Sequence, residues 1–128
     1  MSVLVDSSIW IQAQNPRNGE CIHLKKLITQ GELIYITEII QVEVSQGARN
    51  EELFFKIWDS FLGFPNLKVT DDIWLKSAQN FFKCRKKGIT PTTIDCLIAT
   101  TAKYYDVPLW TADKGMKLLS QIVGFRNY

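Results

Sequence analysis

The chain has 128 residues, of which 46% are hydrophobic and 22% are charged, a size and composition typical of one folded domain with its own core. It contains no run of about 18 apolar residues, so no membrane-spanning helix is expected. No basic and apolar leader precedes the first predicted strand, which favours a cytoplasmic location. The net charge of +2 is too small to require a nucleic-acid partner.

Short hydrophobic runs alternate with amphipathic helical patterns along the chain. The expected strands are Ser2–Asp6, Leu33–Ile36, Leu67–Val69, Val107–Trp110 and, as a last edge strand, Gly124–Asn127. The expected helices are Ser7–Gln12, Glu20–Gln30, a segment capped by Thr37 and ending near Gln46, Asn50–Leu62, a segment capped by Thr70 or Asp71 and ending at Lys87, a segment opened by Thr90–Thr92 and ending at Tyr105, and Lys114–Gln121. This alternation predicts an α/β fold in which helices cover both faces of a parallel sheet.

Four acidic residues lie after predicted strands or on the core-facing side of predicted helices. They are Asp6, Glu43, Asp95 and Asp113. Asp6 ends the first strand and Asp113 follows the strand Val107–Trp110, so both are expected at the carboxyl edge of the sheet, where ligands bind in such folds. Buried carboxylates are costly unless they are paired or bound to a metal. The placement of these acids therefore indicates a metal site.

Glu43 lies near the centre of the apolar side of its predicted helix. At about 100° per residue, an apolar stripe lies within about 60° of this acid, and it consists of Ile36, Ile39, Ile40 and Gly47. The opposite, polar side carries Glu38, Gln41 and Ser45. A solvated surface glutamate is not expected at the centre of an apolar stripe. The alternative is a charge that reaches solvent past the small residue Gly47.

Each of the other three acids also has a purely structural interpretation. The spacing of Thr92 and Asp95 fits a capping box at a helix N-terminus. Asp95 also stands at the end of a buried, small-residue helix face, and both interpretations stay open. Asp6 and Asp113 could each cap the helix that follows, although Ser7 could cap the first helix in place of Asp6.

The joint pattern favours a metal over four separate caps. Two carboxylates about 4 Å apart repel by about 4 kcal/mol at an effective dielectric constant of about 20, and a divalent cation reverses the sign of that interaction. A set of oxygen ligands without His or Cys favours Mg²⁺ or Mn²⁺ over zinc. Such a cation can activate water and stabilise a leaving oxyanion. The predicted chemistry is hydrolysis of a phosphodiester.

Four stretches of the chain carry a resemblance to a known family. They are Val3–Ser8, Thr37–Gly47, Thr93–Ala102 and Leu109–Asp113. In this order and spacing they are similar to PIN-domain ribonucleases, in particular to the toxin half of VapBC-type toxin–antitoxin modules. The resemblance covers almost the whole chain. One departure is Met116, where many relatives carry an aromatic residue, but this change removes no metal ligand.

The resemblance implies a single PIN domain over residues 1–128, with a three-layer α/β/α sandwich around a short, mostly parallel sheet. It implies a catalytic site that binds Mg²⁺ (or Mn²⁺) through Asp6, Glu43, Asp95 and Asp113, with Ser7 and Thr111 in support. The expected activity is that of a metal-dependent endoribonuclease, the toxin of a toxin–antitoxin pair. The expected partners are the RNA substrate, a cognate antitoxin protein and a second copy of the chain in a homodimer.

Other function classes fit the sequence less well. A haloacid-dehalogenase-like phosphatase would carry a second acid where this chain has Ser8, and a dinucleotide-binding domain would carry a G-x-G motif, whereas no two of the seven glycines are two residues apart. The three cysteines form no C-x-x-C pair, and His23 is the only histidine. Two alternatives stay open: a catalytically silent PIN-like module that binds RNA or a partner, and a nuclease that belongs to no toxin–antitoxin pair.

Basic residues that could contact RNA phosphates are few. The densest run is Lys83–Gly88, a composition that a helix C-terminus favours equally well. The single candidates are Arg49, Lys114, Lys117 and Arg126.

Overall fold

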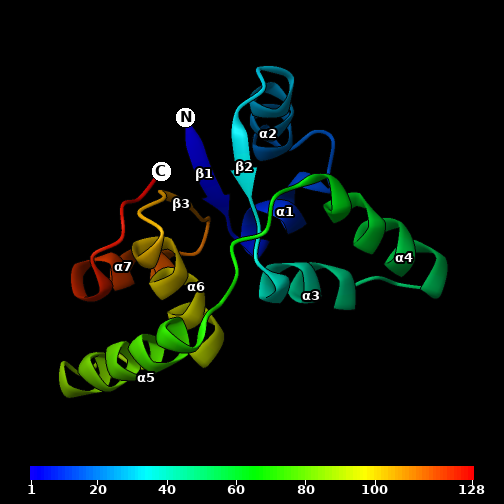
Figure 1. Ribbon diagram of the computed structural model, residues 1–128. Coiled ribbons are helices and arrows are strands. Elements are labelled where there is room, and N and C mark those ends of the chain that lie inside the picture. Colours follow the sequence, from blue (N-terminus) through cyan, green and yellow to red (C-terminus); the bar gives the residue numbers. More distant parts are fainter.

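A computed structural model describes residues 1–128 as a small parallel sheet surrounded by helices (Figure 1). The strands are β1 (Ser2–Val5), β2 (Leu33–Tyr35) and β3 (Leu109–Trp110). The helices are α1 (Ser7–Ala13), α2 (Gly19–Thr29), α3 (Glu38–Gln46), α4 (Glu51–Ser60), α5 (Asp71–Lys86), α6 (Thr93–Tyr104) and α7 (Lys114–Val123), with a 3-10 turn, η1 (Phe61–Gly63), after α4. No helix has both the length and the apolar composition that crossing a bilayer requires.

The sheet has the strand order β2-β1-β3, and both pairings are parallel. Isolated parallel bridges widen it at each edge, one between Ile36 and Asn66 and one between Leu109 and Asn127. The strand expected at Leu67–Val69 does not form, and only the residue before it, Asn66, makes a bridge, while the edge strand expected at Gly124–Asn127 is reduced to the bridge at Asn127. At the first edge Pro65 has no N–H group and only accepts a hydrogen bond from Ile36, which limits the pairing there.

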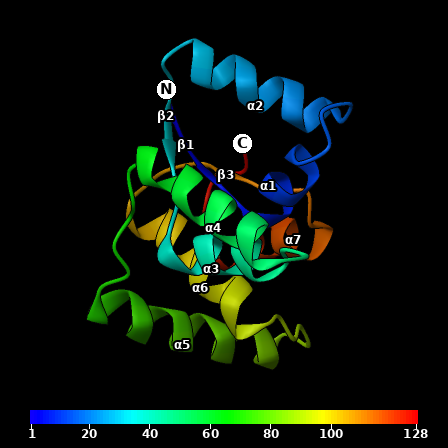
Figure 2. The ribbon, with the colours of Figure 1, turned by 90° about the vertical axis from the view of Figure 1, so that its right-hand side faces the viewer.

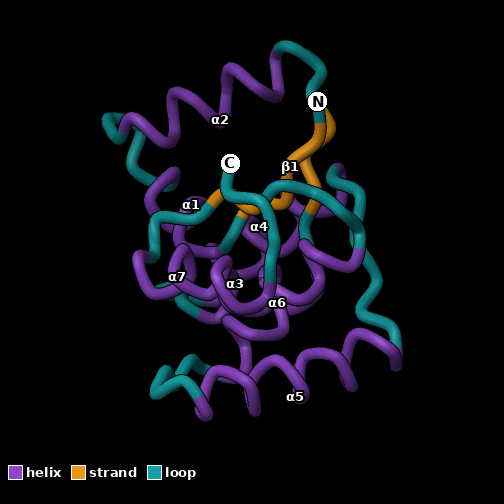
Figure 3. Tube along the Cα trace, turned by 90° about the vertical axis from the view of Figure 1, so that its left-hand side faces the viewer, coloured by secondary structure: helices purple, strands orange, loops and turns teal.

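The side chains of β1 alternate between two hydrophobic cores. Val3 and Val5 pack with Leu24 of α2 and with residues of α1, whereas Leu4 packs with Ile40 of α3 and with residues of α6 and α7. Figure 2 shows α2 on one side of the strands and α6 with α5 on the other, and Figure 3 shows the same layers from the opposite direction. The predicted three-layer α/β/α arrangement is confirmed.

Helix α3 is covered on more than one side, which the sequence pattern did not predict. Gln41 and Ser45, expected on a polar side, are 8% and 0% exposed. Helix α4 packs against α3, and the side-chain amide of Gln41 donates a 3.2 Å hydrogen bond to the carbonyl of Trp58. Gln41 and Ser45 on the polar side of α3 therefore face the protein interior, whereas Glu38 on the same side stays exposed.

Helix α5 begins and ends where its sequence indicates. The hydroxyl of Thr70, and not Asp71, caps its N-terminus by accepting a hydrogen bond from the backbone N–H of Ile73. Gly88 follows its C-terminus with a φ of +77°, which side chains with a Cβ adopt only under strain. This helix packs mainly on α6 and forms the outer edge of the molecule in Figures 1 and 2.

Candidate active site at the carboxyl edge of the sheet

Asp6 is buried at the junction of β1 and α1, with 3% of its surface exposed. It occupies the N-cap position of α1, but its side chain makes no capping hydrogen bond. Instead its Oδ2 accepts hydrogen bonds from the hydroxyls of Ser8 at 2.7 Å and Thr111 at 2.8 Å. Its Oδ1 has only the hydroxyl of Ser7, at 3.5 Å. One carboxylate oxygen is therefore held by two short hydrogen bonds, and the other has a single long one.

The two hydroxyls that hold Asp6 also connect α1 to the loop after β3. Each hydroxyl gives its single proton to Asp6 and accepts from a backbone N–H group in return, Ser8 from Ala112 and Thr111 from Asp113, both at 3.0 Å. Thr111 was expected at this site from the sequence, whereas Ser8 was not. Ser7 and Ser8 follow Asp6 directly, so the sequence does place a second hydroxyl near the acid.

Glu43 projects from α3 and is half-buried, and its Oε1 is buried without any hydrogen-bond partner. Burial raises the pKa of Glu43, the nearby Ser7 hydroxyl lowers it, and the negative charges of Asp6 and Asp95 raise it further. An unpaired buried carboxylate oxygen is unfavourable in a folded protein. This atom thus lacks a partner that a bound cation could provide.

Asp95 lies in the first turn of α6 and is half-buried. The capping expected there is done by Thr92, whose hydroxyl accepts a 3.0 Å hydrogen bond from the backbone N–H of Asp95. The carboxylate itself accepts no backbone hydrogen bond, so it is not needed as a cap. Burial raises the pKa of Asp95, the Thr92 hydroxyl lowers it, and the charges of Asp113 and Asp6 raise it further.

Asp113 differs from the other three acids because it is exposed and caps a helix. Its Oδ1 accepts hydrogen bonds from the backbone N–H groups of Gly115 at 2.8 Å and Met116 at 3.3 Å, at the start of α7. The capping expected for Asp113 is thus present, and its Oδ2 is not used. Met116, the departure from the family pattern, is fully buried in the core.

The fold brings the four acids to one edge of the sheet without closing them into a cage. The negative charges of Asp6 and Asp95 raise the pKa of Glu43, and those of Asp113 and Asp6 raise the pKa of Asp95. None of the four forms an ion pair with a basic side chain. No three His, Cys, Asp or Glu side chains lie close enough together to hold a metal ion. Uncompensated like charges repel, which favours this open arrangement.

The donor atoms of this edge fit a hydrated divalent cation. They are carboxylate oxygens, which Mg²⁺ and Mn²⁺ prefer, and Mg²⁺ keeps several of its waters when only one or two carboxylates reach it. The buried, unpartnered Oε1 of Glu43 and the Oδ1 of Asp6, which has only a long hydrogen bond from Ser7, are the two atoms that fit this requirement best.

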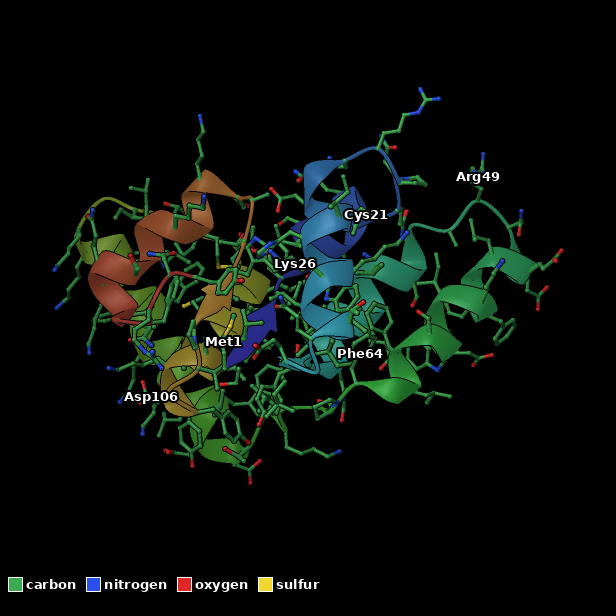
Figure 4. The ribbon with its side chains drawn as sticks, turned by 90° about the horizontal axis from the view of Figure 1, so that it is seen from above. Met1, Cys21, Lys26, Arg49, Phe64 and Asp106 are labelled. Atoms are coloured by element: carbon green, nitrogen blue, oxygen red, sulfur yellow. The ribbon has the colours of Figure 1, made fainter.

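The single basic candidates do not neutralise these acids. Arg126 is engaged elsewhere, since it donates a hydrogen bond to the carbonyl of Asp106 and lies 3.4 Å from its carboxylate. Figure 4 shows Asp106 and Arg49 on opposite sides of the molecule, with Arg49 in the loop between α3 and α4. His23 hydrogen-bonds the hydroxyl of Tyr128 at 2.7 Å.

Comparisons with known proteins match this fold. The sequence model of the PIN domain family matches residues 3–121. The chain is 23% identical to the VapC ribonuclease Mb1587 of Mycobacterium bovis, over 97% of this chain and 96% of that protein. It superimposes on the crystal structure of VapBC2 from Rickettsia felis bound to a DNA fragment from their promoter with a TM-score of 0.81, at 19% identity over 100% of this chain and 98% of that chain.

A second solved structure is VapBC-5 from Mycobacterium tuberculosis, described as a member of the VapBC family of toxin–antitoxin systems. Its TM-score is 0.70 at 16% identity, over 99% of this chain and 98% of that one. Identities this low support a shared fold, whereas the family match covers most of the sequence. The chain therefore belongs to the PIN domain family.

Proposed function

We propose that residues 1–128 form one PIN domain that acts as a metal-dependent endoribonuclease, with Asp6, Glu43, Asp95 and Asp113 binding Mg²⁺ (or Mn²⁺). The observation that carries this proposal is the set of carboxylates without basic partners, among them the buried Oε1 of Glu43 that lacks any hydrogen bond. The curated relative of similar length is named a VapC ribonuclease, which supports RNA as the substrate.

Three hydroxyl side chains position the proposed metal ligands. Ser8 and Thr111 hold Oδ2 of Asp6 and leave Oδ1 with only the long contact to Ser7. Ser7 lies between the carboxylates of Asp6 and Glu43 and supports both. A bound divalent cation supplies a water of lowered pKa and stabilises a leaving oxyanion. It also offsets the negative charge that would otherwise repel an RNA phosphate.

The proposal includes an antitoxin partner. The VapBC-5 structure, which shares the fold, belongs to the family of toxin–antitoxin systems. The chain has an apolar groove of about 260 Å³ between α1, α2 and α4. It is lined by Trp10, Ala13, Leu24, Ile28, Ile57 and Phe61, among others. Such a groove suits the apolar face of a partner helix, and an Arg or Lys from the same partner would pair with the unpaired acids.

A catalytically silent module that binds RNA or a partner is the second candidate. Two observations favour it: no three acids are close enough to hold a metal on their own, and Asp113 uses one oxygen as a cap. The two candidates predict opposite results in a cleavage assay.

The test uses the purified chain and a labelled RNA. We expect cleavage that stops in EDTA and returns with Mn²⁺. Glu43→Gln should abolish cleavage, whereas Glu38→Gln on the same helix should not, because Glu38 is exposed and paired with Lys68. Full cleavage in EDTA would contradict the metal mechanism, and equal activity of the two variants would exclude Glu43 as a ligand.

A further inference from the structure

A polar hollow of about 470 Å³ lies between α5, α6 and α7, away from the four acids of the candidate active site. Helix α6 starts near those acids with Asp95 and reaches the hollow in its last turns, at Thr100 and Tyr104. Tyr104 is nine residues beyond Asp95, which is about 13 Å along the helix. Helix α7 starts after Asp113 and reaches the hollow only at its end, with Val123. Figure 1 shows the three helices packed together on one side of the sheet. The hollow is therefore separate from the proposed metal site.

Three lysines supply the charge of this hollow, and no acid lines it. Lys76 and Lys83 come from α5 and Lys103 comes from α6. Lys76 is paired with Asp72 at 3.1 Å, whereas Lys83 and Lys103 form no ion pair within the chain. The side chain of Lys103 reaches the end of α7, where its Nζ lies 3.8 Å from the position of a Cβ at Gly124. The unneutralised lysines make the hollow attractive to an anion.

Neutral hydrogen-bond donors accompany the lysines. Thr100 is the most buried residue of the lining, with 2% exposed, and its hydroxyl donates to the carbonyl of Cys96 at 2.7 Å. The same hydroxyl oxygen accepts a 3.0 Å hydrogen bond from Nδ2 of Asn80. The Asn80 amide is thereby held in place, and its second N–H has no partner in the chain. Gln79 and Tyr104 add an amide and a hydroxyl to the lining. Phosphate oxygens accept hydrogen bonds from both ammonium groups and such neutral donors.

A second hollow adjoins the first and adds an aromatic surface. The two hollows share Gln79 and Lys83. The second is also lined by Phe82, which is 60% exposed, and by Lys86, whose Nζ lies 4.7 Å from the centre of the Phe82 ring. Nucleotide bases stack on exposed aromatic rings while nearby cations hold the phosphates. An inorganic anion would engage the lysines and leave the ring unused, so the combination favours a nucleotide.

We propose that the two hollows together bind one nucleotide, with its phosphate between Lys83 and Lys103 and its base against Phe82. A free nucleotide and a nucleotide within an RNA strand present the same phosphate and base, so both are sources of this ligand. Binding requires neither a metal nor cleavage. The site is thus independent of the proposed function.

Calorimetric titration of AMP into the purified chain in EDTA tests the site, because the chelator prevents a metal from holding phosphate at the four acids. We expect one AMP to bind per chain. Lys83→Glu should weaken this binding at least about tenfold, because it replaces attraction of the phosphate by repulsion. Arg85→Glu is the matched control: it makes the same charge change two residues away on an exposed side chain that lines neither hollow. It should weaken binding less than about twofold.

Phe82→Ala tests the contact with the base. It should weaken AMP binding at least about fivefold and leave the binding of inorganic phosphate unchanged. Trp74 is a ring of similar exposure on the same helix, at 51%, and it lines neither hollow. Trp74→Ala should therefore change the binding of neither probe.

A short 2′-O-methyl oligonucleotide, which resists hydrolysis, distinguishes the two sources of the nucleotide. If the ligand is part of an RNA strand, this probe should bind at least about tenfold more tightly than AMP and lose affinity in the Lys83 and Phe82 variants. If the ligand is a free nucleotide, the oligonucleotide should bind no more tightly than AMP. Either result supports the site. Absence of binding by both probes, or binding that Lys83→Glu or Phe82→Ala leaves unchanged, would overturn it.

Discussion

The hydroxyl of Thr111 donates a 2.8 Å hydrogen bond to Oδ2 of Asp6, across 105 positions of the sequence. The same oxygen of Thr111 accepts the backbone N–H of Asp113. Thr111 therefore orients one acid and fixes the backbone of another. Its own side chain is buried, so its contribution to the site is one of positioning.

We expect Thr111→Val to reduce RNA cleavage at least about tenfold and the free energy of unfolding by about 1–3 kcal/mol, because the N–H of Asp113 loses its acceptor. Cleavage rates and urea unfolding provide the measurements. Thr101→Val is the control: it also removes a buried hydroxyl, one that donates to the carbonyl of Leu97 within α6. It should lower stability and leave cleavage unchanged, and a Thr111 variant with the same behaviour would have no role in the site.

Because the pKa of Glu43 is raised, the stability of the metal-free protein, measured in EDTA, should depend on pH. Between its ordinary pKa of 4.5 and the higher folded value, the native state binds more protons than the unfolded state, so stability falls as pH rises through this window. Glu43→Gln should remove that part of the pH dependence and slightly stabilise the metal-free protein at pH 7, by less than about 1 kcal/mol because solvent screens the half-buried carboxylate. Glu38→Gln should show neither effect. If Glu43→Gln instead destabilises the protein, the carboxylate has a favourable partner.

The N-terminus of α6 allows capping and catalysis to be separated. Thr92→Ala should reduce stability by about 0.5–2 kcal/mol, because it removes the side chain that accepts from the N–H of Asp95. Asp95→Asn should abolish cleavage without that loss, since its carboxylate accepts no backbone hydrogen bond. Thermal unfolding and cleavage should be measured for both variants. An Asp95→Asn protein that is active but much less stable would assign Asp95 to the cap.

Helix capping and metal binding by Asp113 need a different pair of variants to be separated, because one side chain has both roles. Asparagine caps a helix as well as aspartate does, so Asp113→Asn should keep the stability and lose most of the cleavage. Asp113→Ala should lose both, with about 1 kcal/mol of stability. If Asp113→Asn cleaves RNA normally, Asp113 serves α7 alone.

Production of the chain without its partner should arrest bacterial growth, and the cognate antitoxin should restore it. Asp6→Asn should relieve the arrest without any partner. Ile28→Glu should keep the arrest but weaken the rescue, because Ile28 lines the apolar groove. Ile22 is exposed on the same helix and does not line the groove, so Ile22→Glu should be rescued normally. Normal growth with abundant soluble chain would exclude the toxin role.

The prediction of β1 and of the helix caps succeeded because the relevant signals are local. Buried strands show as short apolar runs, and Thr37, Thr70 and Thr92 cap helices with side chains adjacent to the turns they close. The same local signals located Asp6 and Asp113 at strand ends.

The features that the sequence did not predict depend on contacts between distant segments. Gln41 and Ser45 are buried because α4 folds back on α3, and no periodicity within α3 reports that neighbour. Ser8 belongs to the site because Ala112 and Asp6 meet at its hydroxyl.

The central position of β1 has a consequence for the order of synthesis. Its neighbour β3 is made after more than four-fifths of the chain, and Oδ2 of Asp6 obtains the second of its two hydroxyl donors only when Thr111 has been added. Contacts of such long sequence separation slow folding, because the long loop between the two segments must be closed first. A nascent chain on the ribosome thus carries its first acid from the outset but assembles the acidic edge only near the end of translation. A product that stops before Thr111 would lack Asp113 and the hydroxyl that joins Asp6 to the loop after β3.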